Sequence, residues 1–192
     1  MLVIVYKRMN KELRSKIQNM KISIYIAAAA NGLISNTRNV PDWLSPEYGA
    51  GMMAICQNYK AVIMGRVTYD ILAPDYLPLT HEGTTVVLTN NEAARSDNST
   101  VVFTKADPAE IVQLLTERGH THAVIIGGTA TISAFVKAGV VDDIYFVMEP
   151  VLFGSGLPLL KGVEAEVKLK LLEVKKLNDH TVQLHYEIVR PS

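Results

Sequence analysis

Residues 62–69 read VIMGRVTY and residues 124–131 read VIIGGTAT, and these two stretches are the most informative part of the sequence. In both, an apolar run typical of a buried strand stops at glycine and gives way to small or hydroxyl-bearing residues. Glycine lets a ligand approach the backbone closely, and the N–H groups at the start of the next helix carry partial positive charge. The two stretches therefore predict strand-to-helix turns that hold the phosphates of a dinucleotide.

The composition indicates one compact domain. The 192 residues are 48% hydrophobic and 20% charged, which is enough to bury a sizeable core. Lys+Arg and Asp+Glu both number 19, so no net basic charge would attract nucleic acid or a membrane surface. The single cysteine, Cys56, leaves no intrachain disulfide and is typical of a reducing compartment, so we expect a cytoplasmic protein.

The first twenty residues are expected to be an appendage to a single domain that covers residues 21–192. Residues 1–6 are apolar but too short for a membrane span or a signal-peptide core. Residues 7–19 are rich in Lys, Arg, Asn and Gln, and the first clear strand pattern begins at Lys21. Three explanations stay open: a loosely held helix, an arm that grips a second subunit, or an artefact of start-codon choice.

From Lys21 the sequence alternates between strand-like and helix-like segments, which indicates an α/β fold with a largely parallel sheet. After a first strand and a polar loop through Pro41, a helix is expected from Ser45 to Asn58. The expected strands are residues 22–30, 61–64, 84–88, 100–103, 122–126 and 142–151. Further helices are expected to begin near Arg66, Asp107 and Thr129.

The last part of the chain has the pattern of an antiparallel hairpin. Apolar and polar residues alternate in residues 181–189, which follow residues 168–174 across the Asn178-Asp179 turn. We therefore expect a mixed, mostly parallel sheet that ends in an antiparallel C-terminal hairpin.

Six segments carry a resemblance to a known family. They are residues 24–27 leading to 31–34, residues 64–69, Gly127-Gly128, and residues 139–143 running into 150–160. In this order they resemble the dihydrofolate reductase-like fold, and within it the reductase domain of bacterial riboflavin biosynthesis and its stand-alone relatives. The resemblance covers nearly everything from Lys21 to Val189 and implies a three-layer α/β/α sandwich. Residues 150–160 favour the riboflavin-type branch over true dihydrofolate reductases.

The resemblance implies that NADPH binds at the carboxyl ends of the strands. By position, Ala27 and Ile34 would flank the nicotinamide. The adenosine side would lie against Gly65, Arg66, Val67 and Thr68, and the adenine ribose against Leu88, Thr89 and Asn90. The pyrophosphate would lie against Gly127, Gly128, Thr129, Ala130 and Thr131. Arg66 and Lys105 are the expected partners of a 2′-phosphate, because that dianion attracts exposed cations, which favours NADPH over NADH.

Two residues are candidates for the catalytic step. Hydride transfer needs an acceptor carbon close to the nicotinamide and, for many products, a proton source. Glu47 is the carboxylate closest to the position used by dihydrofolate reductases, although the helix dipole alone would explain an acid in a first turn. Asn31 stands where the riboflavin-type branch usually has Asp; its amide could bind a substrate hydroxyl, but Asn31-Gly32 is also an ordinary turn pair.

Other reactive side chains have simpler explanations. His120 and His122 have no further ligands at a suitable spacing, so no metal is expected. Cys56 lies on an apolar helix face and is expected to pack in the core. Asp142-Asp143 begins a strand, where a cap or an ion pair is the common role.

The preferred hypothesis is an NADPH-dependent reductase that transfers hydride to a C=N or C=O group of a small pterin-, pyrimidine- or ribosylamino-like substrate. Two alternatives stay open: a nucleotide-binding module without turnover, and a true dihydrofolate reductase. A homodimer is also expected, because the apolar run at residues 144–148 exceeds what one sheet face needs and riboflavin-type relatives commonly pair.

Overall fold

The computed structural model describes residues 20–73, 75–164 and 166–190. The expected appendage therefore lies outside the described residues, apart from Met20, which is buried in the core. Within the described residues, no helix has the length and apolar character that crossing a membrane requires.

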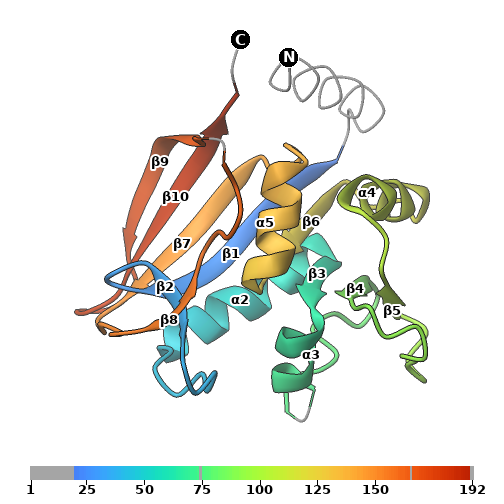
Figure 1. The fold of residues 1–192 in the computed structure, drawn as a ribbon, viewed down its shortest axis with the longest axis horizontal. Coiled ribbons are helices and arrows are strands. Elements are labelled where there is room, and N and C mark those ends of the chain that lie inside the picture. Colours follow the sequence, from blue (N-terminus) through green and yellow to red (C-terminus); the bar gives the residue numbers. More distant parts are fainter. Residues whose placement is uncertain (1–19, 74, 165, 191–192) are drawn as a thin grey trace.

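An eight-stranded sheet forms the centre of the molecule, in the order β5-β4-β3-β6-β1-β7-β10-β9 (Figure 1). Neighbouring strands from β5 to β7 run parallel, whereas β10 runs antiparallel to both β7 and β9. The expected mixed sheet with an antiparallel C-terminal hairpin is confirmed. The strands are β1 (Lys21–Ala29), β3 (Ala61–Gly65), β4 (Thr84–Leu88), β5 (Val101–Thr104), β6 (His122–Ile125), β7 (Asp143–Glu149), β9 (Lys168–Lys176) and β10 (Val182–Val189).

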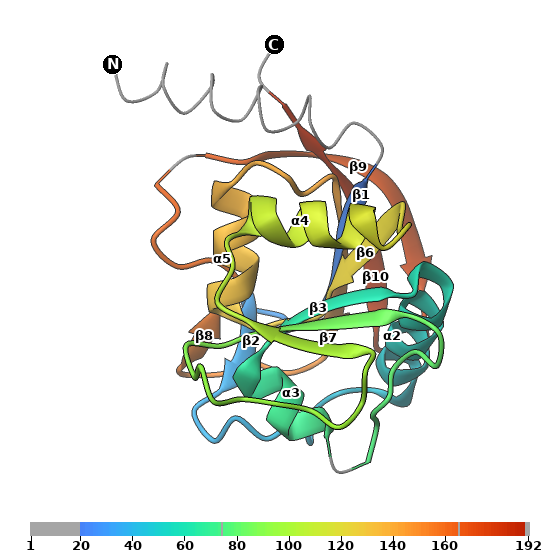
Figure 2. The ribbon, with the colours of Figure 1, turned by 90° about the vertical axis from the view of Figure 1, so that its right-hand side faces the viewer.

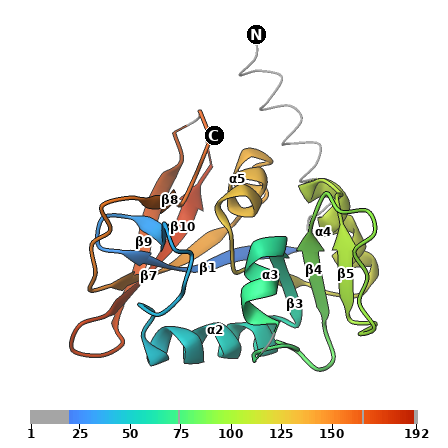
Figure 3. The ribbon, with the colours of Figure 1, turned by 60° about the horizontal axis from the view of Figure 1, so that its bottom comes forward.

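Helices cover both faces of the sheet, which confirms the three-layer arrangement (Figures 2 and 3). One face packs against α2 (Pro46–Tyr59), and the other against α4 (Pro108–Glu117) and α5 (Thr129–Lys137). A short helix, α3 (Arg66–Leu72), follows the carboxyl end of β3. The apolar side chains accordingly form two clusters, one on each side of the central strands. Strands buried on both faces need nearly continuous apolar sequence, which β3 and β6 have.

Local capping signals set the helix starts where the sequence predicts them. Ser45 is the N-cap of α2, and its hydroxyl accepts a hydrogen bond from the backbone N–H of Tyr48. Asp107 and Glu110 form a reciprocal capping box at the start of α4. Cys56 is fully buried on α2, so its expected packing role is confirmed. Asp143 pairs with Lys21 at 2.6 Å, as expected for an acid at the start of a strand.

The expectation of a polar loop after Asn31 is wrong in part, because a second sheet forms there. It consists of β2 (Leu33–Asn36) and the antiparallel β8 (Gly156–Pro158). The two strands touch so closely that a Cβ on Gly156 would lie 1.9 Å from the Ser35 carbonyl oxygen. Short strands paired over such a separation leave no periodic signal, so sequence patterning does not reveal them.

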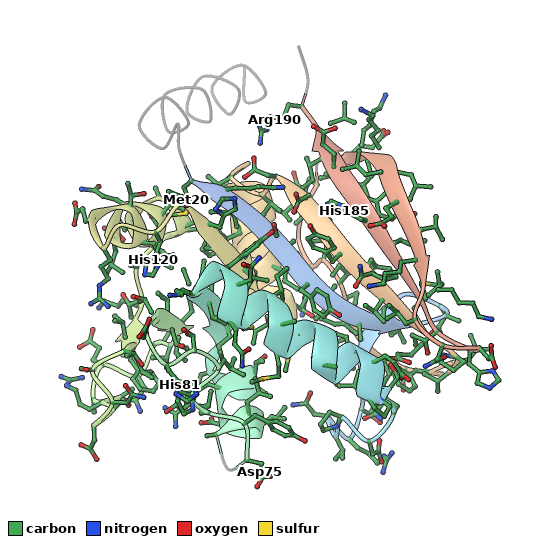
Figure 4. All side chains as sticks on the ribbon, turned by 180° about the vertical axis from the view of Figure 1, so that it is seen from behind. Met20, Asp75, His81, His120, His185 and Arg190 are labelled. Atoms are coloured by element: carbon green, nitrogen blue, oxygen red, sulfur yellow. The ribbon has the colours of Figure 1, made fainter. Side chains whose placement is uncertain are left out.

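The C-terminal hairpin is more exposed than the other strands. Every residue of β9 is exposed, and the view from behind shows α2 leaving β9 and β10 uncovered (Figure 4). On the opposite side, Leu169, Leu171 and Val174 of β9 pair with Ile188, Tyr186 and Leu184 of β10, and directly paired residues share one face. We call these six residues the apolar hairpin face. Leu169, Leu171 and Val174 are 43%, 50% and 58% exposed.

Candidate active site

The two glycine turns lie in direct contact at the carboxyl ends of β3 and β6. These strands are neighbours, with Val62 opposite Val124 and Ile63 opposite Ile125. Immediately beyond them, the backbone N–H of Gly65 donates to the carbonyl oxygen of Gly127 at 2.9 Å. Two stretches that are about sixty residues apart in the sequence therefore build one continuous surface.

Side chains larger than hydrogen would crowd this surface. A Cβ on Gly65 would lie 3.0 Å from the Thr131 hydroxyl, and a Cβ on Gly127 would lie 3.1 Å from the Thr68 hydroxyl. Gly127 also has a φ of +136°, which side chains with a Cβ rarely adopt. The residues thus form a cradle of backbone bordered by two threonine hydroxyls, which fits a pyrophosphate.

Helix α5 points its N-terminus at the same cradle. Its N-cap residue is Gly128, which has no side chain to cap the first turn. The Thr129 hydroxyl is turned away, donating to the Pro158 carbonyl oxygen at 2.6 Å. The N–H groups of this first turn have no acceptor within the helix, so they can bind an anion.

Arg66 lies beside the cradle at the start of α3. Its Nε donates to Asp70 at 2.7 Å, and its guanidinium lies 5.6 Å from the centre of the Phe103 ring on β5. These two contacts fix the guanidinium near the ends of β3 and β5, while the side chain stays 40% exposed. A terminal guanidinium nitrogen can therefore reach a bound phosphate.

The other expected adenosine-side residues share this edge of the sheet. Leu88 ends β4, opposite both Gly65 of β3 and Thr104 of β5. Thr89 and Asn90 follow it, and Lys105 follows β5, where it pairs with Glu92. The structure thus brings the residues predicted for the adenosine and phosphate groups to one edge.

A cavity of about 530 Å³ adjoins the glycine turns. Its walls come from β1, β2, the loop before α2, the first half of α2 and α3, together with Tyr76 and Ile126. Ala27, Ile34 and Thr68, three of the residues predicted to contact the cofactor, line it. Thr68 also borders Gly127, so the cavity opens directly beside the phosphate cradle.

The cavity is lined mostly by apolar groups, with a minority of uncharged polar groups such as those of Asn39 and Ser45. Trp43, Leu44, Met52, Met53 and Leu72 form much of its lining. Among the described residues that line it there is no Asp, Glu, Lys, Arg or His. The sequence does not assign these apolar residues to a site, since each is equally typical of a core. The available signal was the helical spacing of Pro46, Gly49 and Met53 along one face of α2.

A buried carboxylate, that of Glu149, lies behind Ser45 in the cavity wall. Glu149, at the end of β7, is 1% exposed and accepts three hydrogen bonds. Two come from the backbone N–H and the hydroxyl of Ser45, at 3.0 and 2.7 Å, and one comes from the Thr181 hydroxyl at 3.1 Å. Ser45 itself lines the cavity, so the carboxylate charge is separated from the cavity by this single residue.

The phenol of Tyr48 is a poor acid in this setting. Tyr48 lines the cavity and stacks on Tyr25, with ring centres 5.4 Å apart. Burial raises the pKa of Tyr48 above its ordinary value, and burial together with the Glu149 charge raises the pKa of Tyr25 to about 12. Both phenols therefore hold their protons at neutral pH.

The two residues predicted to be catalytic lie outside the cavity lining. The Asn31 amide nitrogen donates to the Phe153 carbonyl oxygen at 2.7 Å, which ties the β1–β2 turn to the segment before β8. Glu47 accepts a hydrogen bond from Asn178 in the β9–β10 turn at 2.9 Å. The geometry agrees with the turn and first-turn interpretations of these residues, and a catalytic role for either stays a prediction.

Other candidates from the sequence make ordinary contacts. The His120 ring forms a hydrogen bond with the Thr84 hydroxyl, and the His122 ring forms one with the Thr121 hydroxyl. In the part of the chain that the structure describes, no three His, Cys, Asp or Glu side chains are grouped so that they could hold a metal ion.

The architecture defines a dihydrofolate reductase-like α/β protein. A dihydrofolate reductase from Enterococcus faecalis, solved with NADP(H), superposes with a TM-score of 0.61 at 21% identity, over 89% of this chain and 97% of that one. A putative riboflavin biosynthesis protein from Shewanella sp. PV-4 superposes with a TM-score of 0.77 at 24% identity, over 89% of this chain and 100% of that one. Riboflavin biosynthesis reductases share the fold.

The family follows from the sequence match. The model of the RibD C-terminal domain matches residues 20–183, and the chain belongs to this family. The uncharacterized protein YwjB of Bacillus subtilis (strain 168) is 30% identical over 172 residues, which are 86% of this chain and 97% of YwjB. The family and its structural neighbours support an oxidoreductase.

Proposed function

We propose that the protein is an NADPH-dependent reductase that transfers hydride to a C=N or C=O group of a small molecule in the apolar cavity. The observation that carries the proposal is the closeness of Thr68, which lines the cavity, to Gly127 in the phosphate cradle, where a Cβ would lie 3.1 Å from the Thr68 hydroxyl. A dinucleotide whose pyrophosphate lies in the cradle can extend its nicotinamide into the cavity beside Ala27 and Ile34.

Different residues bind the coenzyme and orient the substrate. The α5 N-terminus and residues 127–131 hold the pyrophosphate, and Arg66 and Lys105 attract the 2′-phosphate. The apolar walls exclude water and hold the substrate ring against the nicotinamide, which places the reacting atoms at contact distance. The bound cofactor supplies the hydride.

The cofactor preference can be tested by titration. Arg66→Ala is expected to weaken NADPH binding about tenfold or more, by removing a charge-assisted contact with the 2′-phosphate. NADH lacks that phosphate, so its affinity should hardly change. Arg38→Ala, on an exposed pair with Asp42 away from the cradle, is the matched control. Equal affinity of the native protein for both cofactors, with no loss in Arg66→Ala, would contradict the assignment.

We also infer that the protein forms a homodimer through the apolar hairpin face. The apolar run at residues 144–148 does not supply this surface, because β7 lies between β1 and β10, and Ile144 and Val147 are buried. The edge strand β9 instead exposes four large apolar side chains, three of which lie beside one another on the apolar hairpin face. A long apolar edge strand invites pairing with a second chain, and a closed dimer would cover it.

A further inference from the structure

We infer that the cavity takes a flat, largely apolar cyclic iminium ion, that is, a ring whose C=N bond carries a positive charge. The inference rests on the proposed reductase function. It names the substrate class of that site from three properties of the cavity: its uncharged lining, the lack of an acidic group at its surface, and the carboxylate behind Ser45.

The lining first excludes anionic substrates. No cationic side chain occurs among the described residues that line the cavity. The cation on its rim loop, Arg38, already pairs with Asp42 at 2.9 Å, and both are exposed to water. A phosphate or carboxylate in this apolar space would lose its hydration without gaining a partner, which disfavours binding strongly.

The lining also limits which kind of C=N or C=O group can be reduced in the cavity. Reduction of a neutral imine or carbonyl needs a proton as well as a hydride, and a nearby acid normally supplies it. The described lining has no carboxyl, imidazole or ammonium group, and Tyr48 is a weak acid. An iminium ion needs no proton: its carbon receives the hydride, the C=N π electrons become the lone pair on nitrogen, and a neutral amine and NADP⁺ result.

The buried carboxylate then favours a cation. Glu149 receives its three hydrogen bonds from neutral donors, a backbone N–H and two hydroxyls. Its negative charge thus reaches the cavity with only Ser45 between them, in a region of low dielectric constant. An opposite charge in the cavity is therefore attracted across Ser45, and we expect this attraction to raise affinity about tenfold.

Three ring compounds of nearly equal shape test the charge preference. They are N-methyl-3,4-dihydroisoquinolinium, its neutral carbon isostere 3-methyl-1,2-dihydronaphthalene, and 3,4-dihydronaphthalene-2-carboxylate. Binding to the coenzyme-free protein, so that no charged nicotinamide lies beside the ligand, is read from the fluorescence of Trp43, the single tryptophan of the chain and part of the cavity wall. We expect the cation to bind at least tenfold more tightly than the neutral isostere, and the anion to bind most weakly.

Two variants test whether Glu149 and the uncharged wall of the cavity cause the preference for a cation. Glu149→Gln should reduce the affinity for the cation about tenfold and leave the neutral isostere unchanged, whereas the rim control Asp42→Asn should change neither. Met53→Lys, which places a positive charge in the wall, should reverse the order in favour of the anion, and it keeps the test valid if Glu149→Gln folds poorly.

The outcomes separate this inference from the reductase proposal. If the cation binds no better than its isostere, or the anion binds best, the inference is wrong. If NADPH is oxidised by neutral or anionic C=N and C=O compounds but not by the iminium, the inference fails while the reductase proposal holds. If the cation binds as expected but no compound is reduced, the ligand class holds and the reductase proposal fails.

Discussion

At the scale of single residues, glycine positions explain why distant segments can approach one another. Gly65, Gly127 and Gly156 lie where a Cβ would press on another part of the chain. The sequence predicts the first two, because each ends an apolar strand run. The sequence does not predict the close contact at Gly156. The obstructing Ser35 carbonyl lies 121 residues earlier and belongs to a strand that leaves no periodic pattern.

Gly156→Ala is expected to destabilise the fold by about 1–3 kcal/mol, because the added methyl group forces β8 away from β2. Gly154→Ala is the matched control, since nothing lies within 4 Å of a Cβ at that position. Urea unfolding of both variants gives the free energies. Equal stabilities would mean that the β2–β8 contact is looser than described.

At the scale of elements, Ser45 at the start of α2 both caps the helix and donates a hydrogen bond to the buried Glu149. The sequence predicts only the cap. Ser45 is recognisable as an N-cap from its place before Pro46 and Glu47. Its second partner, Glu149, lies 104 residues later, and no local pattern connects the two. Apart from β2 and β8, the sequence predicts the strands and helices to within about two residues, because their periodicity and caps are local, whereas the carboxylate behind the cavity requires the sheet order.

Ser45→Ala should therefore cost more stability than the loss of a cap alone. Removing an N-cap costs about 0.5–2 kcal/mol, and Ser45→Ala also deprives the buried Glu149 of a charge-assisted hydrogen bond worth about 1.5–3 kcal/mol. Asp107→Ala, at the cap of α4, removes only exposed capping contacts. Thermal or urea unfolding should rank Ser45→Ala as the more damaging change; the reverse order would contradict the Ser45–Glu149 link.

At the scale of the whole molecule, the parallel half and the antiparallel half of the sheet have different surroundings. Helices cover the parallel strands on both faces, and the phosphate cradle lies at their carboxyl edge. The hairpin extends beyond this cover. Its alternation predicted an antiparallel pair, but the sequence could not show that β9 would be exposed along its whole length, because that depends on where the helices pack.

The proposed homodimer rests on that exposure and can be tested on the hairpin. The double variant Leu171→Glu with Val174→Glu should give a monomer at micromolar concentration, because two buried charges would face the apolar partner surface. Lys175→Glu changes the charge of the same strand outside the apolar hairpin face and should leave the dimer intact. Sedimentation velocity distinguishes the species, and a monomeric native protein would contradict the interface.

We propose that the turns at Gly65 and Gly127 close around one coenzyme whose nicotinamide enters the apolar cavity. A crystal structure of the protein with NADPH tests it most directly. We expect the pyrophosphate on residues 127–131, the 2′-phosphate beside Arg66, and the nicotinamide between Ala27 and Ile34. Coenzyme bound elsewhere, or with its nicotinamide outside the cavity, would contradict the claim.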